Sequence, residues 1–343
     1  MKIGLVGYKG AGKSSLFQWL TGQQPDPSLS HSIQSATAPI PESRFPELIK
    51  IYNPKKITYA SIEIVDTPGL APDQHGNSSK LAQLREINTL VIVIPAFNNA
   101  EPQTEINKFN DDLVIADLEI ILNRIEKIQE QNKRPVPKSE HEKLELEYET
   151  LLILQNALEN NSPLKENQLS LEQLRLTKGF RLLSGKPQML IINTPDDEIN
   201  LNQYQKYSKP DIPLIPISAR LELELESMNQ TDKLNFLEEM QLTSTDKNLV
   251  LKTILDTSGQ MTFITAGEKE LRTWLIPKDC AALDAAAAIH TDMAKGFIRA
   301  EVFKADDLIR LKNERALKAE NLIRKEPKDY IIKDGDVLLF HFS

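Results

Sequence analysis

The sequence predicts an α/β fold with a mostly parallel sheet, a helical insert and a smaller β-rich module at its C-terminal end. Apolar strand candidates at residues 3–6, 60–65, 90–95 and 188–192 alternate with helical stretches. Such alternation is typical of a parallel sheet with helices on both faces. Within residues 105–185 the pattern changes to helical spacing alone, and beyond Gly259 short strands and turns replace it. These changes predict three structural parts.

Composition narrows the class of protein. The 343 residues are enough for two or three domains, and 40% hydrophobic with 26% charged residues is typical of a globular protein. The single cysteine, Cys280, excludes an internal disulfide and fits a reducing compartment. No run of 18 apolar residues is present, so we expect no membrane span. The net charge of −8 argues against a protein that coats nucleic acid non-specifically.

The first strand runs into GYKGAGKS at residues 7–14, which fits the GxxxxGK[ST] phosphate loop. The glycines allow successive backbone N–H groups to point at phosphate oxygens, and the following helix adds its positive N-terminal end. The lysine of this motif reaches the β- and γ-phosphates, and the serine hydroxyl ligates Mg²⁺. The predicted phosphate-binding residues are Gly7, Gly10, Ala11, Gly12, Lys13, Ser14 and Ser15.

A second motif, DTPG at residues 66–69, follows the strand at 60–65. In a DxxG arrangement the aspartate holds Mg²⁺ through a water molecule and the glycine N–H contacts the γ-phosphate. We therefore predict Ser14 and Asp66 as the Mg²⁺ ligands. Lys13 and Gly69 are the predicted catalytic groups.

A third motif, NTPD at residues 193–196, ends the strand at 188–192. Its asparagine and aspartate have the spacing of a base-reading N-K-x-D motif, in which the carboxylate accepts two N–H bonds from guanine. A further strand at 214–217 ends in a Ser-Ala turn suited to contact the base. The alternative is an ordinary Asx/Pro turn, but the order of the motifs favours base reading. The predicted base-contacting residues are Asn193, Asp196, Ser218 and Ala219.

The insert at residues 105–185 predicts an antiparallel helical hairpin with a coiled-coil-like seam. The proline-containing stretch 133–137 separates its two helices, because proline stops a helix. The predicted seam residues are Leu118, Leu122, Ile125 and Ile128, and Leu144, Tyr148, Leu151, Gln155 and Leu158. The charged outer face of residues 140–149 is interpreted as a solvated surface, with a docking arm as the alternative.

The C-terminal module predicts a small, half-open β-grasp pattern. Residues 261–265 and 273–276 form a hairpin pattern, and an alanine-rich helix covers 281–290. Residues 330–333 and 337–340 are predicted as two strands around an Asp-Gly turn.

With these motifs in order, the chain resembles the YchF / Obg-like ATPase family of P-loop NTPases over nearly its whole length. Residues 38–45 and 51–56 are similar to the family's segment between switch I and the second strand. Residues 262–274 resemble the start of its TGS domain, and 289–302 are similar to its HTD-x-x-x-GFIRAEV run. The resemblance implies a ribosome-associated NTPase that hydrolyses ATP, and often GTP less selectively.

The resemblance also implies the domain boundaries and the partners. Residues 1–104 with 186–255 would form the P-loop G domain, 105–185 the hairpin insert and 260–343 the TGS domain. We expect ATP or GTP, Mg²⁺ and the ribosome or its RNA as ligands, with neither membrane nor DNA, and a cytoplasmic monomer. Residues 295–333 carry 11 lysines and arginines against 7 acidic residues, which agrees with RNA contact. A solvated surface of mixed charge is the alternative.

Several residues depart from the family's pattern. Gly10 stands where the family usually has asparagine, and Asp196 where it usually has glutamate. Thr194 lacks the lysine stem that packs on the base in GTPases, so the sequence leaves the choice between adenine and guanine open. In switch I, Ser30 is the candidate for the Mg²⁺-contacting threonine.

Switch II, after Gly69, is shorter than in the family. Leu70 occupies the position of the water-orienting glutamine of many GTPases, and Ile92 aligns with the family's histidine. Gln74 or His75 could orient water instead, although a solvent-facing role is favoured for both. Hydrolysis is therefore expected to be slow or to need a partner. The alternative is a divergent, hydrolysis-poor scaffold; a GTPase of ribosome assembly or tRNA modification is disfavoured, because such chains usually carry the full N-K-x-D lysine.

Overall fold

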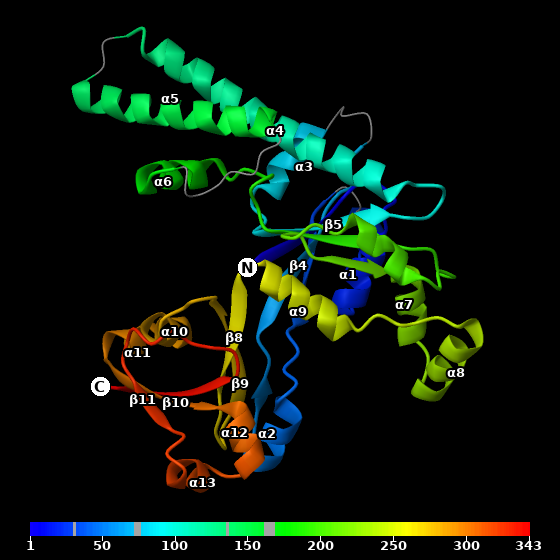
Figure 1. The fold of residues 1–343 in the computed structure, drawn as a ribbon, viewed down its shortest axis with the longest axis vertical. Coiled ribbons are helices and arrows are strands. Elements are labelled where there is room, and N and C mark those ends of the chain that lie inside the picture. Colours follow the sequence, from blue (N-terminus) through cyan, green and yellow to red (C-terminus); the bar gives the residue numbers. More distant parts are fainter. Residues whose placement is uncertain (30–31, 72–76, 135–136, 161–168) are drawn as a thin grey trace. The chain divides into compact units, whose positions relative to one another are not determined.

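The computed structural model describes residues 1–29, 32–71, 77–134, 137–160 and 169–343. They form two compact units, each made of two separate stretches of the chain (Figure 1). The first unit comprises Met1–Ala36 and Ile64–Thr245, and the second comprises Thr37–Glu63 and Asp246–Ser343. Every helix in the described ranges is too short or too polar to cross a lipid bilayer.

A six-stranded sheet in the order β2-β4-β1-β5-β6-β7 lies mainly in the first unit, and residues 37–39 of β2 and 61–63 of β4 belong to the second. Strands β1, β5, β6 and β7 pair in parallel, which confirms the predicted α/β pattern. Strands β1, β5, β6 and β7 are near-continuous apolar runs, because both faces of such a sheet are covered. Their bounds are β1 Lys2–Val6, β2 Gln34–Pro39, β4 Ser61–Asp66, β5 Thr89–Pro95, β6 Gln188–Asn193 and β7 Leu214–Ile217.

One face of this sheet is packed by α3 and the first half of α4. Phe109 and Leu113 of α4 and Leu84 of α3 lie in the same core cluster as Ile92 and Leu190 of the sheet. Helix α1 contacts α7. The helices of the unit are α1 Lys13–Thr21, η1 Pro27–Leu29, α3 Asn77–Leu84, α4 Pro102–Gln131, α5 Lys138–Glu159, α6 Leu171–Phe180, η3 Leu201–Tyr207, α7 Ala219–Glu226 and α8 Gln230–Met240.

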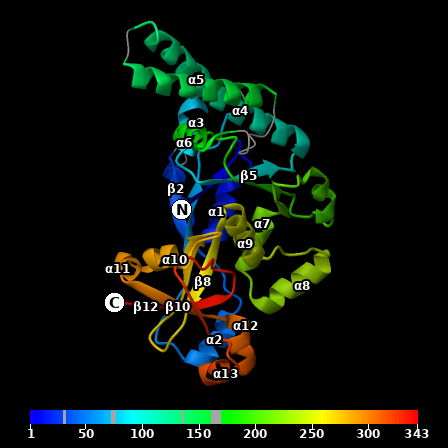
Figure 2. The same ribbon diagram turned by 60° about the vertical axis from the view of Figure 1, so that its left-hand side comes forward.

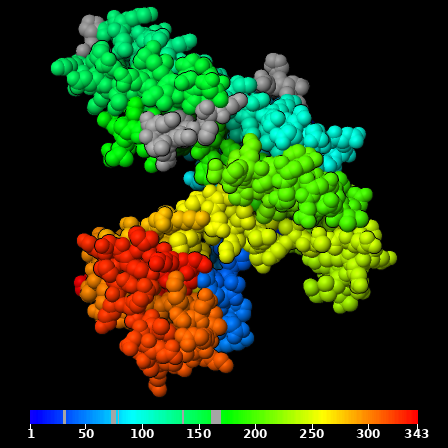
Figure 3. Space-filling view, viewed as in Figure 1, coloured from blue at the N-terminus to red at the C-terminus, as the bar shows by residue number. Residues whose placement is uncertain are grey.

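The predicted helical hairpin is formed by α4 and α5, which lie side by side in both ribbon views (Figures 1 and 2). The space-filling view shows them as a continuous green and teal surface (Figure 3). Two of the predicted seam positions are wrong by one residue. Ile121 rather than Leu122 lies in the seam, with Leu122 42% exposed, and Leu154 rather than Gln155 is buried there. The apolar stripe drifts because 3.6 residues per turn do not match a strict seven-residue repeat.

A charged pair also links the two helices. Arg124 of α4 donates two hydrogen bonds of 2.7 Å to the carboxylate of Glu147 on α5. Glu147, one of the residues interpreted as solvated, therefore takes part in the contact between the helices.

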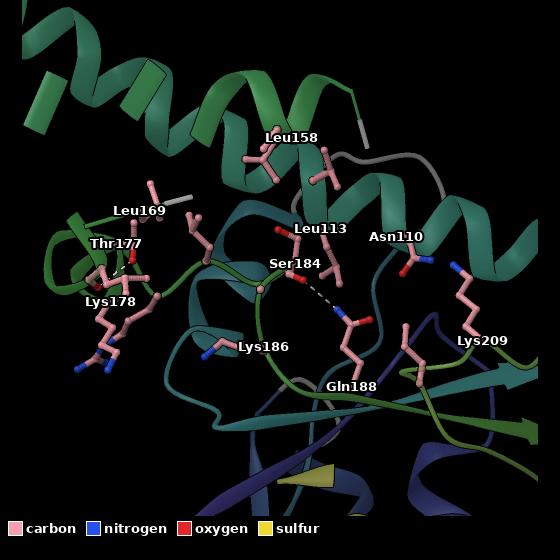
Figure 4. Close-up of a pocket in the computed structure, with 17 residues that line it drawn as sticks. Asn110, Leu113, Leu158, Leu169, Thr177, Lys178, Ser184, Lys186, Gln188 and Lys209 are labelled. Carbon is pink, nitrogen blue, oxygen red and sulfur yellow. Dashed lines mark hydrogen bonds between the residues drawn. The ribbon is translucent and has the colours of Figure 1, made fainter. Parts of the chain in front are cut away.

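A buried carboxylate, Asp117 of α4, ties the insert to the rest of its unit. Asp117 is fully buried and accepts hydrogen bonds from Arg85 Nη1, the N–H groups of Leu183 and Ser184, and Ser184 Oγ. Beside this junction lies an open cavity of about 740 Å³, lined by leucines and by cations such as Lys186 (Figure 4).

The second unit contains a mixed six-stranded sheet in the order β11-β10-β12-β8-β9-β3. The predicted hairpin forms as the antiparallel pair β8–β9, and β12 lies between β8, in parallel, and β10, antiparallel. Its strands are β3 Ile57–Thr58, β8 Gln260–Thr265, β9 Leu271–Pro277, β10 Phe297–Lys304, β11 Arg324–Glu326 and β12 Asp336–Phe342. Its helices are α2 Phe45–Tyr52, α9 Lys247–Thr257, α10 Ala282–Ile289, α11 Thr291–Lys295, α12 Ala305–Leu311 and α13 Glu314–Ala319.

Helices cover both faces of this sheet. Successive strand residues point to opposite faces, and Phe263 packs in a cluster with α10, whereas Ile264 packs with α2, α12 and α13. The alanines of the predicted helix, now α10, allow close approach to the sheet. Cys280 is buried beside them, and burial raises the pKa of its thiol.

The predicted strand at residues 330–333 is wrong. Ile331 makes only an isolated bridge to Ala281, and the antiparallel partner of β12 is β10. The segment leads into a turn at residues 334–335, where Asp336 Oδ2 accepts hydrogen bonds from the Tyr330 hydroxyl, at 2.8 Å, and from the Lys333 N–H, at 2.9 Å. The side-chain carboxylate thus takes the Lys333 N–H, a backbone donor that a strand would have used for its ladder.

The compact units divide the chain differently from the expected domains in two segments. Residues 37–63 and 246–255, placed in the G domain from the sequence, are grouped with the C-terminal stretch. Phe45 and Leu48 of α2 are fully buried in the cluster that contains Leu271 and Leu308.

Candidate functional site

The loop of residues 7–14 joins β1 to α1. Gly7, Gly10 and Gly12 have φ of 145°, 84° and 94°, values that other residues rarely adopt. A Cβ atom at Gly12 would lie 2.0 Å from Asn193 Nδ2, whereas one at Gly10 would meet no atom within 4 Å. The loop is therefore packed against β6 at one point and open at another, as a phosphate-binding loop must be.

Lys13, the first residue of α1, is buried within this loop. Its Nζ donates to the carbonyl oxygens of Tyr8, at 2.8 Å, and Gly7, at 3.2 Å. Burial lowers the pKa of Lys13 to about 8; the nearby Asp66 raises it and the nearby Lys80 lowers it further. A phosphate group beside this ammonium would restore the charged form.

The two predicted Mg²⁺ ligands are in contact. Ser14 Oγ donates a 2.6 Å hydrogen bond to Asp66 Oδ2. The other oxygen, Asp66 Oδ1, is buried and has no hydrogen-bond partner among the described residues. Burial raises the pKa of this carboxyl group. A hydroxyl and a carboxylate with one unpaired buried oxygen fit a hard cation such as Mg²⁺, whose remaining ligands would be water and phosphate oxygens.

Gly69, the predicted γ-phosphate contact, lies against the phosphate loop. A Cβ atom there would be 2.6 Å from Lys9 Cα and 3.0 Å from Lys13 Nζ, so only glycine fits. The next residue, Leu70, bridges to the loop in parallel fashion. Its N–H donates to Gly7 O and its carbonyl accepts from Lys9 N–H, both at 3.1 Å.

The predicted base-reading residues also converge. Asn193 Nδ2 donates to Ala11 O, and Asn193 Oδ1 accepts from Ala219 N–H, both at 3.0 Å. Ser218 Oγ donates to Asp196 Oδ1 at 2.7 Å and caps α7. Asn193 thus links the phosphate loop to the Ser-Ala turn, which an isolated Asx turn would not do.

The site departs from a guanine-specific pattern at two positions. Thr194 stands where GTPases have lysine, and its buried hydroxyl has no partner among the described residues. The guanidinium of Arg220, on the exposed start of α7, lies 3.5 Å from Asp196 Oδ2. Both oxygens of this carboxylate are therefore engaged in this structure.

Residues that could orient a water molecule are limited in the described part of the site. Leu70 and Ile92 are 2% and 1% exposed and lie in the core, so neither position supplies a polar group. The candidates Ser30, Gln74 and His75 lie outside the described residues.

Two residues near the site were not predicted from the sequence. Asn77 and Lys80, on the first turn of α3, hydrogen-bond to the main chain around Leu70. Their position eight and eleven residues after Gly69 was the only available signal, since neither belongs to a motif.

Comparison with known proteins agrees with this geometry. A family model described as a 50S ribosome-binding GTPase matches residues 2–136. The model of the YchF GTPase C-terminal domain, described as a protein of unknown function (DUF933), matches residues 260–343. The ribosome-binding ATPase YchF of Haemophilus ducreyi is 32% identical over 364 residues, covering 100% of this chain and 99% of that protein. The chain belongs to the YchF family.

Other YchF proteins match over a similar extent. The ribosome-binding ATPases YchF of Escherichia coli O157:H7 and Bacillus subtilis are 30% and 28% identical, and each match covers 100% of this chain and 99% of the relative. The structure of the Schizosaccharomyces pombe YchF GTPase superposes with a TM-score of 0.81 at 22% identity, covering 99% of this chain and 97% of that one. The P-loop NTPase fold of the YchF family is therefore shared.

At alkaline pH, nucleotide binding is expected to be accompanied by uptake of a proton at Lys13. Lys13 has a pKa of about 8 in the free protein, and bound phosphates raise it. Affinity should thus be constant well below pH 8 and fall as the pH rises through 8, approaching about tenfold per pH unit. Calorimetry at pH 9 in two buffers of different ionisation enthalpy should detect this uptake. Equal affinity at pH 7 and pH 9 without proton uptake would contradict it.

Proposed function

We propose that this chain binds an Mg²⁺-nucleotide, hydrolyses ATP or GTP, and acts as a nucleotide-controlled switch on the ribosome. The observation that carries the proposal is the group formed by Lys13, Ser14 and Asp66 at the phosphate loop. A buried ammonium lies beside a hydroxyl–carboxylate pair that has one unpaired oxygen. Such a group needs a counter-anion and a cation together, which an Mg²⁺-nucleotide supplies.

Each residue has a distinct role in this proposal. Lys13 would stabilise negative charge on the β- and γ-phosphates, and the Gly69 N–H would contact the γ-phosphate. The N–H groups of the phosphate loop and of Ser15 would hold the remaining phosphate oxygens. Ser14 and Asp66 would hold Mg²⁺, which when bound neutralises charge that develops on the phosphate oxygens.

The rate of hydrolysis is proposed to be low without a partner. Leu70 and Ile92 are buried and apolar, so neither can position the attacking water. The same observation supports the second candidate, a hydrolysis-poor scaffold in which bound nucleotide controls binding of RNA or protein.

The ribosome is the proposed partner because the relatives are named ribosome-binding ATPases. We also propose that residues 105–185 act as a hairpin insert of the G domain and residues 260–343 as a TGS domain. The positive charge of residues 295–333 is partly neutralised within the fold: Lys304 pairs with Asp336, and Arg310 with Asp307 and Glu320. Lys295, Arg299 and Arg324 also pair with carboxylates. The exposed lysines of this stretch that form no such pair, among them Lys312, Lys325 and Lys328, would contact RNA.

Nucleotide preference, turnover and ribosome binding are the tests of this proposal. We expect ADP or GDP to bind in the presence of Mg²⁺, and slow release of phosphate from the corresponding triphosphate. Asp66→Asn should weaken the Mg²⁺ dependence of binding. Co-sedimentation with ribosomes should depend on whether a di- or triphosphate is bound.

The outcomes separate the candidates. Tight binding without turnover, either alone or with ribosomes, would support the scaffold. Failure to bind either nucleotide would overturn both candidates. A preference for ADP would show that the site recognises adenine. A preference for GDP would mean that Asn193 and Asp196 bind guanine without the lysine of the N-K-x-D motif.

A further inference from the structure

The first turn of α3 holds the main chain that follows the DTPG motif. Asn77 Oδ1 accepts from the Ala71 N–H and Asn77 Nδ2 donates to the Ala71 carbonyl, both at 2.9 Å. Three residues later, Lys80 Nζ donates a 2.7 Å hydrogen bond to the Gly69 carbonyl. Positions i and i+3 share one face of a helix, so the two side chains hold the chain on both sides of Leu70.

Leu70 itself is fixed from the opposite direction. Its N–H and carbonyl pair with Gly7 and Lys9 of the phosphate loop, and its side chain is buried in the core with Leu81 of α3. Within segment 69–71, the Gly69 N–H is then the one backbone donor without a partner among the described residues. It is the group that the DxxG motif presents to a γ-phosphate.

Lys80 also brings charge to this position. It forms no ion pair with a carboxylate in the part of the chain that the structure describes. Its ammonium donates to the Gly69 carbonyl, and Lys13 Nζ would lie 3.0 Å from a Cβ atom at Gly69, so both ammonium groups lie beside this residue. Two neighbouring ammonium groups repel each other, and an anion placed near both relieves the repulsion. From the two motifs, we expect the β-phosphate of a diphosphate to reach Lys13, and the γ-phosphate of a triphosphate to add charge on the side of Gly69.

We propose that Asn77 and Lys80 are positioning residues that make the site respond to the γ-phosphate. They fix the peptide groups next to Gly69 so that its N–H faces the γ-phosphate, and Lys80 adds a positive charge there. Helix α3 is thereby joined to the nucleotide through side-chain contacts that no motif of the sequence predicts. This inference rests on the proposed nucleotide binding and adds the residues that distinguish a triphosphate from a diphosphate.

The test compares affinities for a diphosphate and for its non-hydrolysable imidotriphosphate analogue, using the base that the chain prefers. Lys80→Met should weaken the triphosphate analogue about tenfold to a hundredfold, the range for a lost hydrogen bond from a charged group. Affinity for the diphosphate should stay within a factor of about two, because Lys13 and the phosphate loop are unchanged. Asn77→Ala should change the ratio in the same direction, and Lys80→Arg should restore most of it.

Lys127→Met is the matched control, since it removes an exposed lysine of α4 in the same unit. It should leave both affinities unchanged. The proposal is overturned if Lys80→Met binds the triphosphate analogue as tightly as the wild type. It is also overturned if Lys80→Met weakens both nucleotides equally, which would indicate a purely structural role. A wild-type chain that binds neither nucleotide would overturn the proposed function as well, so the two failures are distinguishable.

Discussion

Replacing Lys13 by methionine is expected to lower the turnover of ATP or GTP about 10²–10³-fold, the cost of removing one pre-oriented donor from a transition state. The methionine side chain has a similar length and no charge. Lys13 is 6% exposed and its ammonium is held by two carbonyl groups of the loop. Phosphate release in single-turnover conditions would measure the effect on chemistry separately from binding.

Stability provides the control for this variant. A buried ammonium costs free energy to desolvate, so Lys13→Met should not lower the free energy of unfolding by more than about 1 kcal/mol. Turnover equal to that of the wild type would contradict the assigned role. If Lys13→Met loses turnover because it unfolds, Ser14→Ala becomes the test of the phosphate loop's role in turnover. This variant removes a predicted Mg²⁺ ligand and keeps the Lys13 ammonium.

Asp117→Ala is expected to destabilise the first unit by about 3–5 kcal/mol, because it leaves the largely buried Arg85 guanidinium without its carboxylate partner. Asp117 is 0% exposed and accepts hydrogen bonds of 2.7–2.9 Å from Arg85, Leu183 and Ser184. The substitution removes the hydrogen bonds by which α4 is joined to Arg85, which follows α3, and to Leu183 and Ser184, in the loop before β6. Urea denaturation, followed by circular dichroism, would measure the change.

Glu147→Ala is the matched comparison for this change. It also removes a carboxylate from an arginine pair, but Arg124 is 32% exposed at its side chain and can be hydrated. We expect a cost of about 1 kcal/mol or less. Equal effects of the two substitutions would refute the view that burial makes the Asp117 pair important.

The convergence of the candidate nucleotide-binding residues was largely predictable because they lie in short motifs at strand ends. In a parallel sheet these ends meet at one edge, so the order of the motifs was enough to place Lys13, Asp66 and Asn193 together. The contacts of Asn193 with Ala11 and Ala219 agree with that placement. The P-loop fold followed from the same argument.

Contacts between distant segments were not predictable. Nothing in the sequence near Asp117 indicates that it pairs with Arg85, since 32 residues separate them. The strand predicted at 330–333 failed for a related reason. Its apolar residues match a strand locally, but the side chain of Asp336 binds the Tyr330 hydroxyl and the Lys333 N–H.

The interleaving of the two compact units has a consequence for folding during synthesis. Helix α2 leaves the ribosome early, but the strands that bury Phe45 and Leu48 belong to the last hundred residues of the chain. At about 5–20 residues per second, translation leaves this apolar face uncovered for on the order of ten seconds or longer. By contrast, every residue of the first unit has been synthesised once Thr245 is made. A fragment that begins at Asp246 would lack α2 and β3, so the C-terminal unit depends on residues synthesised long before it.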